Sequence, residues 1–342
     1  MNIINITANY KCSMGYNEFK GEFSKILGIN VIHSHAGIGV YSEKLQKAMG
    51  INLISIPLDK NKSKLQYPGR IIYPEYPKIT SGWLLNSFKT GKYIKNEKFS
   101  LLHYTAPILK PIRDDDIVTF HDLYMFEKKD NEGIAKKLDK LYLRRIINKY
   151  KNLNILSISN ETTMNLIDAG FNEDKITTVY NYIDPIFSKR NIKKIENSIL
   201  TVGDDWWKNS EKIDKIVHGK YYHIHVGRNR ADLNYVDVTP EEMVNIYNQA
   251  EVLVRMNKFE GFGYPPLESL FCGTPVVTSD LGIYHETLND SAIFSGFDDL
   301  IKNIGIAMDQ RDKLLSNFEK IKDRYTIETY KRKMSEFYSN LL

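Results

Sequence analysis

Cysteine is almost absent from this sequence: Cys12 and Cys272 are the only two among 342 residues. Two thiols so far apart exclude a disulfide framework and a cysteine-based zinc site, and they suit a reducing, cytoplasmic compartment. Long apolar runs are missing as well, since no stretch approaches the ~20 consecutive apolar residues of a membrane span. The chain also turns polar after its first few residues, so we expect no signal peptide.

Charge is not strongly of one sign, but its small excess is unevenly placed. The formal net charge is +5, whereas residues 1–185 alone carry 26 Lys or Arg against 19 Asp or Glu. Much of the excess lies in residues 59–98, where nine basic and three acidic residues are interleaved with aromatic ones. Such a segment indicates either an anionic partner, such as a membrane surface or a phosphorylated lipid, or a solvated loop region anchored by its aromatic side chains. We expect no nucleic-acid partner.

What the sequence does have is a regular alternation of short apolar runs with amphipathic stretches. A chain of 342 residues suits two domains of about 150–200 residues, and strand–helix alternation is typical of parallel sheets covered by helices. The class predicted is therefore α/β. Strands are expected at residues 2–7, 51–58, 99–105, 116–122, 154–159, 175–181, 198–203, 221–227, 250–256 and 274–279. Helices are expected at residues 41–50, 136–151, 160–170, 239–250, 265–273 and 326–342.

The break between the two domains is expected near residues 182–197. This stretch has a proline, scattered charges and no periodic apolar face, which is the composition of a linker. The sequence therefore predicts one domain at residues 1–183 and a second at residues 184–342.

The most informative stretch is EGFGYPPLE, residues 260–268. It follows the strand expected at residues 250–256. Gly261 and Gly263 allow a turn in which the backbone approaches a ligand closely, and the paired prolines fix the start of a helix. A glycine turn thus leads into a helix N-terminus at the carboxyl end of a parallel strand. That is where α/β sheets bind ligands and where free N–H groups attract phosphate.

Two carboxylates flank this turn. Glu260 precedes it, and Glu268 is expected in the first turn of the helix. Carboxylates beside an anion site do not suit the phosphate itself; they suit hydroxyl groups of a sugar and of a ribose. A plainer interpretation is that Glu268 only complements the helix dipole and that Glu260 is a surface charge. The glycines, the prolines and the CGTPVV run that follows favour the ligand site.

The segment EGFGYPPLESLFCGTPVVTSDLGIYHE, which begins at Glu260, resembles the E-x7-E signature of a large family of retaining nucleotide-sugar glycosyltransferases with the GT-B fold, the glycosyl transferases group 1. Other segments resemble parts of the same family in the same order, and the resemblance leaves out residues 10–36 and 59–98. These segments are residues 37–45 (GIGVYSEKL), 117–123 (IVTFHDL), 156–184 and 199–209 (ILTVGDDWWKN).

The resemblance implies two Rossmann-like domains facing each other across a cleft, with the nucleotide on the C-terminal domain and the acceptor mainly on the N-terminal one. It also implies that the last helix, about residues 327–342, packs back on the N-terminal domain. The implied activity is transfer of a sugar, with retention and without metal or cofactor, from a nucleoside-diphosphate sugar to a hydroxyl of a glycan or lipid-linked acceptor. Residues 59–98 favour an anionic acceptor, or peripheral contact of a cytoplasmic protein with the membrane.

By position in the motifs, the resemblance assigns roles to single residues. Glu260 would contact hydroxyls of the donor sugar, and His121 would lie beside the transferred sugar. Glu268 would contact the nucleotide ribose, and Lys208 would neutralise the diphosphate. Gly39 would let an N-terminal glycine loop close over the diphosphate, which the backbone of the turn would hold. The turn residues with this donor-binding role are Gly261, Phe262, Gly263 and Tyr264.

Asp204 departs from the family pattern, in which a basic residue commonly follows the glycine of the first strand of the second domain. One cation for the diphosphate is therefore missing, and Arg228, Arg230 and Arg255 are candidates to replace it because they lie near other strand ends. Asp204 also keeps open a second class of function, a non-catalytic protein that binds a sugar nucleotide or a glycan.

Two more classes of enzyme are compatible with parts of the sequence. One is a GT-B enzyme of different activity, such as an epimerase or a phosphorylase, and the other is a nicotinamide-dependent oxidoreductase. The incomplete glycine fingerprint in GIGVY argues against the oxidoreductase. No metal site is expected. Asp114–Asp116 precedes a strand and should form a solvated turn, and ordinary polar contacts are expected for His33, His35 and His103.

Overall fold

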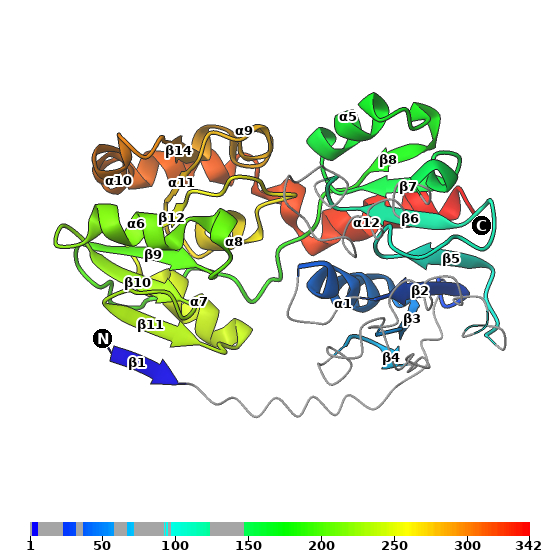
Figure 1. The fold of residues 1–342 in the computed structure, drawn as a ribbon, viewed down its shortest axis with the longest axis horizontal. Coiled ribbons are helices and arrows are strands. Elements are labelled where there is room, and N and C mark those ends of the chain that lie inside the picture. The colour runs from blue at the N-terminus through cyan, green and yellow to red at the C-terminus, as the bar shows by residue number, and fades with distance from the viewer. Residues whose placement is uncertain are drawn as a thin grey trace, which may run out of the picture. The chain divides into compact units, whose positions relative to one another are not determined.

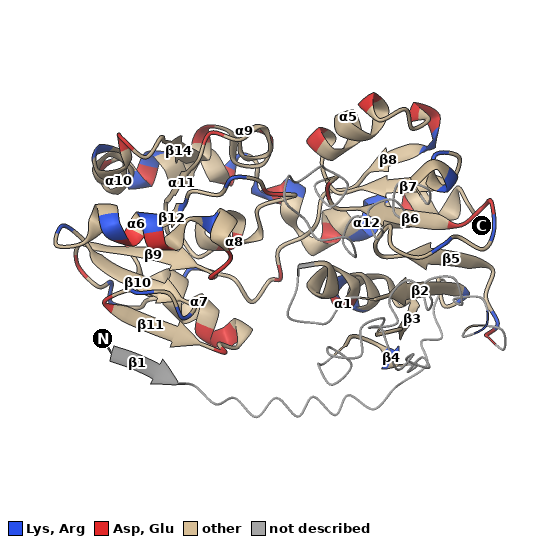
Figure 2. Cartoon of the chain, viewed as in Figure 1, with Lys and Arg blue, Asp and Glu red and all other residues tan. Residues whose placement is uncertain are grey.

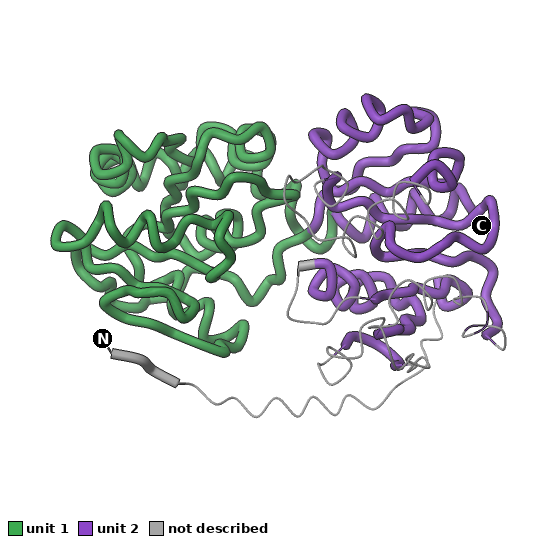
Figure 3. Tube along the Cα trace, in the orientation of Figure 1, with its two compact units in different colours: residues 1–12, 182–329 green, residues 13–181, 330–342 purple. Residues whose placement is uncertain are grey.

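The computed structural model describes residues 2–5, 23–31, 37–57, 67–71, 92, 94, 97–123 and 147–342. The chain divides into two compact units (Figure 3): unit 1 comprises residues 1–12 and 182–329, and unit 2 comprises residues 13–181 and 330–342. Most of the helix predicted at residues 136–151 and most of the basic segment at residues 59–98 lie outside the described residues.

Unit 1 is built on a seven-stranded sheet in the order β1-β11-β10-β9-β12-β13-β14, with every neighbouring pair parallel (Figure 1). The strands are β1 (Asn2–Asn5), β9 (Ser198–Val202), β10 (Tyr222–Val226), β11 (Leu233–Val236), β12 (Val252–Arg255), β13 (Val276–Thr278) and β14 (Ala292–Phe294). The chain runs outward from β9 to β11 and then returns to β12 on the other side of β9. The topological switch point therefore lies between β9 and β12, and such points bind ligands at the carboxyl ends of the strands.

Helices cover this sheet and bury its apolar residues. Buried side chains of α6 and α10, such as Ile213 and Leu300, form one core cluster with Ile199, Val252 and Val254 of the central strands. Helix α8 contacts β12 and β13 and packs against α7 and α9. The helices of unit 1 are α6 (Ser210–Val217), α7 (Pro240–Gln249), α8 (Tyr264–Phe271), α9 (Gly282–Leu288), α10 (Leu300–Asp309) and α11 (Arg311–Glu319), with 3-10 turns η4 (Trp206–Lys208), η5 (Asn289–Ser291) and η6 (Lys322–Tyr325).

Unit 2 has a second sheet of seven parallel strands, in the order β4-β3-β2-β5-β6-β7-β8. Its topological switch point lies between β2 and β5. The strands are β2 (Ile26–Asn30), β3 (Asn52–Ser55), β4 (Arg70–Ile71), β5 (Leu101–Tyr104), β6 (Ile117–Phe120), β7 (Asn154–Ser157) and β8 (Ile176–Thr178). The helices described with both ends in the first half of the chain are α1 (Gly37–Met49) and α5 (Asn160–Asp168), with the 3-10 turn η3 (Glu173–Lys175) before β8. The predicted α/β class with two parallel sheets is confirmed.

Helix α12 (Ile327–Ser339) follows unit 1 in the chain, and from Tyr330 on its residues belong to unit 2. The Tyr338 hydroxyl shares a 2.7 Å hydrogen bond with Nδ1 of buried His103. The rings of Tyr338 and Phe23 lie 5.3 Å apart. A helix from the end of the chain thus fills part of the core that the first half of the chain begins.

One local prediction differs from the structure. The apolar residues at the start of the chain were expected to join the sheet of the first half, but β1 pairs with β11 at the edge of the unit 1 sheet. Helix α5 is capped by Ser159, whose side chain accepts from the Thr162 amide, so Asn160 is its first residue. Thr239 and Glu242 form the capping box of α7, as a Thr-Pro-Glu-Glu start favours.

Charged residues gather on helices and loops, and most strands in Figure 2 are free of them. This is the pattern of strands buried on both faces. Among the strands of unit 1, Arg255 at the end of β12 is the one Lys, Arg, Asp or Glu residue. No helix in the part of the chain that the structure describes is long and apolar enough to cross a membrane.

Candidate active site

The candidate site in unit 1 begins at Arg255, the last residue of β12, which is only 6% exposed. Its Nη1 donates to the carbonyl oxygen of Val202 at the end of β9 (2.6 Å), and its Nη2 donates to Oε2 of Glu260 (3.2 Å). The Asn257 side-chain amide donates to the same Glu260 oxygen at 2.8 Å. Because both donors reach one oxygen and the side chain is 20% exposed, the other Glu260 oxygen can accept a hydrogen bond from a ligand.

Arg255 forms an ion pair with Glu260, and this pair bears on whether the buried arginine remains charged. Burial alone would lower the pKa of Arg255, but Glu260 and Tyr284 together outweigh it and the net shift is upward. Arg255 therefore stays a cation and holds Glu260 in place. Of the three arginines considered as replacements for the missing cation, Arg255 is already engaged with a carboxylate.

The turn after Glu260 ends at Gly263, the N-cap of α8. Gly263 has a φ of 92°, a backbone conformation that favours glycine, and a Cβ there would be crowded by Cε1 of Tyr284 at 3.1 Å. Pro265 and Pro266 follow in the first helical turn. Proline has no N–H, so the amides of Gly263 and Tyr264 are the ones this helix start presents.

The sequence predicted Glu268 in the first turn of the helix, but the structure places it beyond that turn. Helix α8 already begins at Tyr264, which places Glu268 one turn further along. The prolines predict a helix start at residue 265, but the left-handed Gly263 lets the helix begin one residue earlier. The buried Tyr247 hydroxyl donates to Oε2 of Glu268 at 2.9 Å. Burial, reinforced by Glu268, raises the pKa of Tyr247 well above its usual value, so it remains a neutral donor.

The remaining turn residues differ in what they expose. The Phe262 side chain is 2% exposed and packs edge-on against Tyr264 and Tyr325, at 5.3 Å and 5.9 Å between ring centroids. Any contact of Phe262 with a donor would therefore run through its backbone. Gly261 is half-buried and precedes it in the same turn.

Lys208 lies at the carboxyl end of β9, in the 3-10 turn η4. Its Nζ is 2.6 Å from Oδ2 of Asp205, and the two side chains are 21% and 45% exposed. The lysine side chain crosses Gly203, where a Cβ would overlap it. An ion pair this exposed contributes little, so Lys208 can exchange Asp205 for an anionic ligand.

Asp204, the departure from the family pattern, has a structural explanation. Its carboxylate accepts from Nε2 of His225 (2.9 Å) and from the backbone amides of Arg228 and Asn229 (2.8–2.9 Å). Burial alone would raise the pKa of Asp204, but these donors hold it below its usual value. Asp204 thus fixes the loop after β10. The Arg228 side chain itself is 73% exposed and lies 3.5 Å from Asp237, and Arg230 is 67% exposed near Asp214.

His121 follows β6 in unit 2. Its Nε2 donates to the carbonyl oxygen of Thr105 at 2.8 Å, and its ring lies edge-on to Tyr41 with 4.8 Å between centroids. Burial lowers the pKa of His121 to about 4, against the opposing effect of the Thr105 bond. At neutral pH the ring is therefore uncharged and its Nδ1 is an acceptor.

Gly39 is not part of a loop. It lies inside α1, which begins at Gly37, and it is buried. The sequence predicts a helix from Tyr41 and a glycine loop before it, but here these glycines form the first turn of the helix. The predicted helix start is therefore wrong, and the donor-binding role of Gly39 stays a prediction.

Several contacts of the site were not predicted. Asn257 and Tyr247 were missed as partners of the two glutamates, and Tyr284 was missed as the residue that crowds Gly263. A signal for part of this was available, because an arginine directly after VLV is unusual in a buried strand and demands a partner.

The acidic triplet at residues 114–116 is not a solvated turn throughout. Asp116 is fully buried and accepts from the Arg113 amide (2.9 Å) and from the Tyr104 hydroxyl (3.2 Å). Within the described ranges, no three His, Cys, Asp or Glu side chains gather as a metal site requires. His33, His35 and Cys12 lie outside those ranges.

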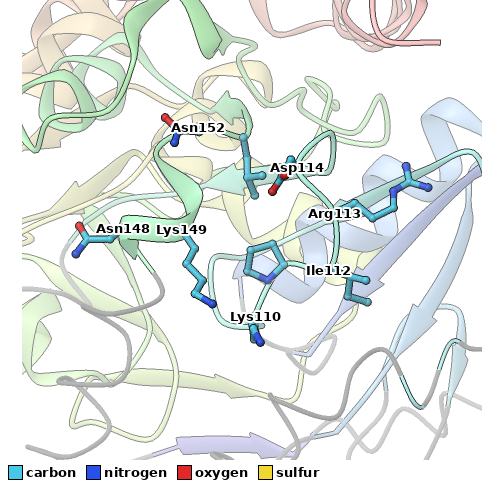
Figure 4. A pocket seen from close by; sticks show the side chains of 9 residues that line it. Lys110, Ile112, Arg113, Asp114, Asn148, Lys149 and Asn152 are labelled. Carbon is cyan, nitrogen blue, oxygen red and sulfur yellow. The ribbon is translucent and has the colours of Figure 1, made fainter.

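Unit 2 also has a cavity of about 790 Å³, lined by residues 110–114, 148, 149, 152 and 153 (Figure 4). These residues precede β6 and β7, so the cavity lies at the amino ends of the strands, away from His121. Arg113 within it is paired with Asp115 at 2.9 Å. The cavity therefore contains none of the predicted site residues.

Known proteins resemble this chain in sequence and in fold. Residues 229–323, which include the segment from Glu260 to Glu268, match the family model of the glycosyl transferases group 1. The chain is 26% identical over 323 residues to the O-antigen chain mannosyltransferase RfbU of Salmonella typhimurium, covering 85% of each chain. Its fold resembles the sucrose-phosphate synthase of Thermosynechococcus elongatus (TM-score 0.71, 14% identity, 92% of this chain and 98% of that one). It also resembles Anabaena Alr3699/HepE solved with UDP-glucose (TM-score 0.70, 13% identity, 92% and 99%).

Two parallel-sheet α/β units with these structural neighbours define a GT-B glycosyltransferase fold. The matches bear out the resemblance to the glycosyl transferases group 1 predicted from the sequence, and they support a nucleotide-sugar-dependent glycosyltransferase.

Proposed function

We propose that this chain transfers a sugar, with retention of anomeric configuration and without a metal ion, from a nucleoside-diphosphate sugar to an acceptor hydroxyl. One observation carries the proposal: Glu260 is fixed by Arg255 and Asn257 at the carboxyl end of β12, directly before the helix start that presents the amides of Gly263 and Tyr264. A fixed hydroxyl acceptor next to a phosphate donor site is what a sugar diphosphate requires.

Each residue of the segment then has one task in the proposal. The Gly263 and Tyr264 amides and the positive end of α8 bind the diphosphate, and Lys208 leaves Asp205 to neutralise it. Glu268, held by Tyr247, accepts from the ribose hydroxyls. Glu260 accepts from hydroxyls of the sugar, and neutral His121 supplies a hydrogen-bond acceptor beside it.

The bond changes follow from these positions. The bond between the anomeric carbon and the leaving phosphate oxygen breaks, and the nucleoside diphosphate departs, stabilised by the cation and the amides. The acceptor oxygen attacks from the same face, and its proton passes to the leaving phosphate. No side chain is assigned as a covalent nucleophile.

The donor and acceptor classes are proposed from the relatives and the charge pattern. One relative is an O-antigen chain mannosyltransferase, and one structural neighbour was solved with UDP-glucose, so nucleoside-diphosphate mannoses and UDP-glucose are the first donors to test. For the acceptor we propose an anionic or lipid-linked glycan, with peripheral membrane contact through basic residues 59–98. Co-sedimentation with anionic vesicles at low salt tests that contact, and protein that remains in the supernatant excludes it.

The decisive experiment is Glu260→Gln. This variant keeps the shape of the side chain but loses a charge-assisted acceptor worth about 1.5–3 kcal/mol, so turnover should fall at least about tenfold. Wild-type and variant enzyme are assayed for release of nucleoside diphosphate, with and without EDTA, and the anomer of the product is read by NMR. Glu211→Gln, an exposed position on α6, is the matched control.

Near-normal turnover in Glu260→Gln would remove this residue from the site. Inversion of the anomer would contradict the retaining mechanism, and loss of wild-type activity in EDTA that Mg²⁺ restores would contradict metal independence.

A further inference from the structure

An aromatic platform lies at the carboxyl edge of the unit 1 sheet. It consists of Trp206 and Trp207 in η4, after β9, and Phe259 in the loop after β12. Trp207 and Phe259 are stacked, with 5.4 Å between ring centroids and 27° between ring planes. Trp206 lies edge-on to both rings, at 6.0 Å and 6.4 Å.

The outer ring of this platform is exposed. Trp206 is 57% accessible, and among the described residues only it and Tyr222 combine a large aromatic side chain with such exposure. Packing in the hydrophobic core therefore does not explain why a tryptophan occupies position 206. A tryptophan kept in solvent at a ligand-binding edge is a feature that points to a partner with an apolar face.

The platform is also held rigid before any ligand binds. The Lys258 amide donates to the Trp207 carbonyl at 2.9 Å, and the Asn209 side chain donates to the Met256 carbonyl at 2.6 Å. These two bonds tie the loop after β9 to the loop after β12. The Lys258 ammonium lies 4.6 Å from the centroid of Trp206, within cation–π range. Such preorganisation lowers the entropy cost of binding.

Position decides which part of a substrate meets this platform. Phe259 directly precedes Glu260, whereas Glu268 lies at the other end of the segment, in α8. The proposed donor places its ribose at Glu268 and its sugar at Glu260. The platform therefore lies beyond the sugar end of the donor, away from the nucleobase.

The chemistry around the platform decides between a sugar and a membrane. Lys208 and Lys258 are balanced by Asp204 and Asp205, so the surroundings carry no net charge to attract an anionic surface. A pyranose ring matches both features: its C–H face packs on aromatic rings, and its hydroxyl edge finds the charged groups at the rim. We infer that the platform of Trp206, Trp207 and Phe259 is a subsite for a sugar ring of the acceptor glycan, next to the point of transfer.

This inference rests on the proposed function for its donor orientation, and two measurements separate the two. The first is steady-state kinetics of Trp206→Ala with a glycan acceptor and the active donor. The KM for the acceptor should rise about tenfold, while the KM for the donor stays within twofold. Tyr222→Ala, an exposed aromatic at the amino end of β10 in the same sheet, should change neither constant.

The second measurement needs no turnover. Saturation-transfer NMR with methyl α-mannoside, methyl α-glucoside and methyl α-galactoside should show transfer to ring C–H protons of at least one probe. The signal should be lost in Trp206→Ala and kept in Tyr222→Ala. It stands even if transferase activity is absent, in which case only the proposed function fails.

Three outcomes would overturn the subsite. One is an unchanged acceptor KM in Trp206→Ala. Another is an equal rise in the donor KM, which would assign the platform to the nucleobase. The third is the absence of any NMR transfer from wild-type protein to the three glycosides.

Discussion

Each unit buries a histidine network in its sheet, and the two networks have different ends. In unit 1 the Thr201 hydroxyl lies 2.7 Å from Nε2 of His223 and 2.7 Å from Nδ1 of His225. The outer nitrogens of these rings reach Asp214 at 3.1 Å and Asp204 at 2.9 Å. Both histidines are thus flanked by a carboxylate.

The network of unit 2 has hydroxyl groups where unit 1 has carboxylates. His103 lies between Tyr338, at 2.7 Å from Nδ1, and Thr119, at 2.7 Å from Nε2. Thr119 continues to the Tyr41 hydroxyl at 2.9 Å, and Tyr41 packs against His121. No carboxylate takes part in this described network.

The partners of each buried histidine determine whether its protonated form is tolerated. Burial, with a small effect of His121, lowers the pKa of His103 to about 3. Burial also lowers the pKa of His223 and His225, but Asp214 and Asp204 oppose that shift. Unit 2 therefore tolerates only a neutral histidine at position 103, whereas unit 1 offers a protonated ring a compensating charge.

Removing the His103 ring should have the largest effect on this comparison. His103→Ala leaves a cavity and two buried hydroxyls that lose their shared partner, so the free energy of unfolding should fall by about 3–5 kcal/mol. Urea denaturation measures the change. Hydrogen exchange of β5 and β6 assigns it to unit 2. The exposed His218, replaced by Ala, is the control. A loss below about 1 kcal/mol would show that this network contributes little.

Acid should have the next largest effect. The unfolded chain binds a proton at His103 near pH 6.5, whereas the folded chain resists protonation until about pH 3. Stability from this group is therefore complete above pH 6.5 and is lost as the pH falls below it, by about 2 kcal/mol between pH 7 and pH 5. Hydrogen exchange at both pH values, corrected for intrinsic rates, should show more loss in β5 and β6 than in β9 and β10. Equal losses of stability in the two units would contradict the difference inferred between their histidine networks.

Tyr338→Phe should have the smallest effect. It removes one hydrogen bond to His103 but keeps the ring that packs on Phe23, so we expect a loss of about 1 kcal/mol. Urea denaturation again provides the measurement, with the exposed Tyr222→Phe as control. A loss as large as that of His103→Ala would mean that Tyr338 holds α12 in place by itself.

Much of the fold was predictable because parallel strands buried on both faces are continuous apolar runs. Runs such as ILTV and VLV stand out from the helices around them. Strand β2 was missed, since Gly28 interrupts ILGIN and lowers its strand character. Strand β11, LNYV, was missed because its buried Asn234 reads as polar; the Asn234 side chain donates to carbonyls of the adjoining loop instead.

The site was predictable where a short segment contains it. Gly263 and the helix after it could be placed because the turn, the prolines and the helix are adjacent in sequence. The contacts that fix the site come from elsewhere: Arg255 bonds to Val202, 53 residues away, and Glu268 to Tyr247, 21 residues away. A single sequence carries no signal for such pairs, and none for the 235 residues that separate His103 from Tyr338.

That last separation has a consequence for how the chain is made. Except for the edge strand β1, all of unit 1 is synthesised between the two parts of unit 2, and its ends meet where the Ile183 amide donates to the Tyr325 carbonyl at 2.9 Å. During vectorial synthesis unit 1 can close as soon as residue 325 has emerged. Synthesis of unit 2 begins before that of most of unit 1, but His103 lacks its hydrogen-bond partner Tyr338 until the last helix has been synthesised. The unit that contains most of the first half of the chain is therefore the last to complete its folding.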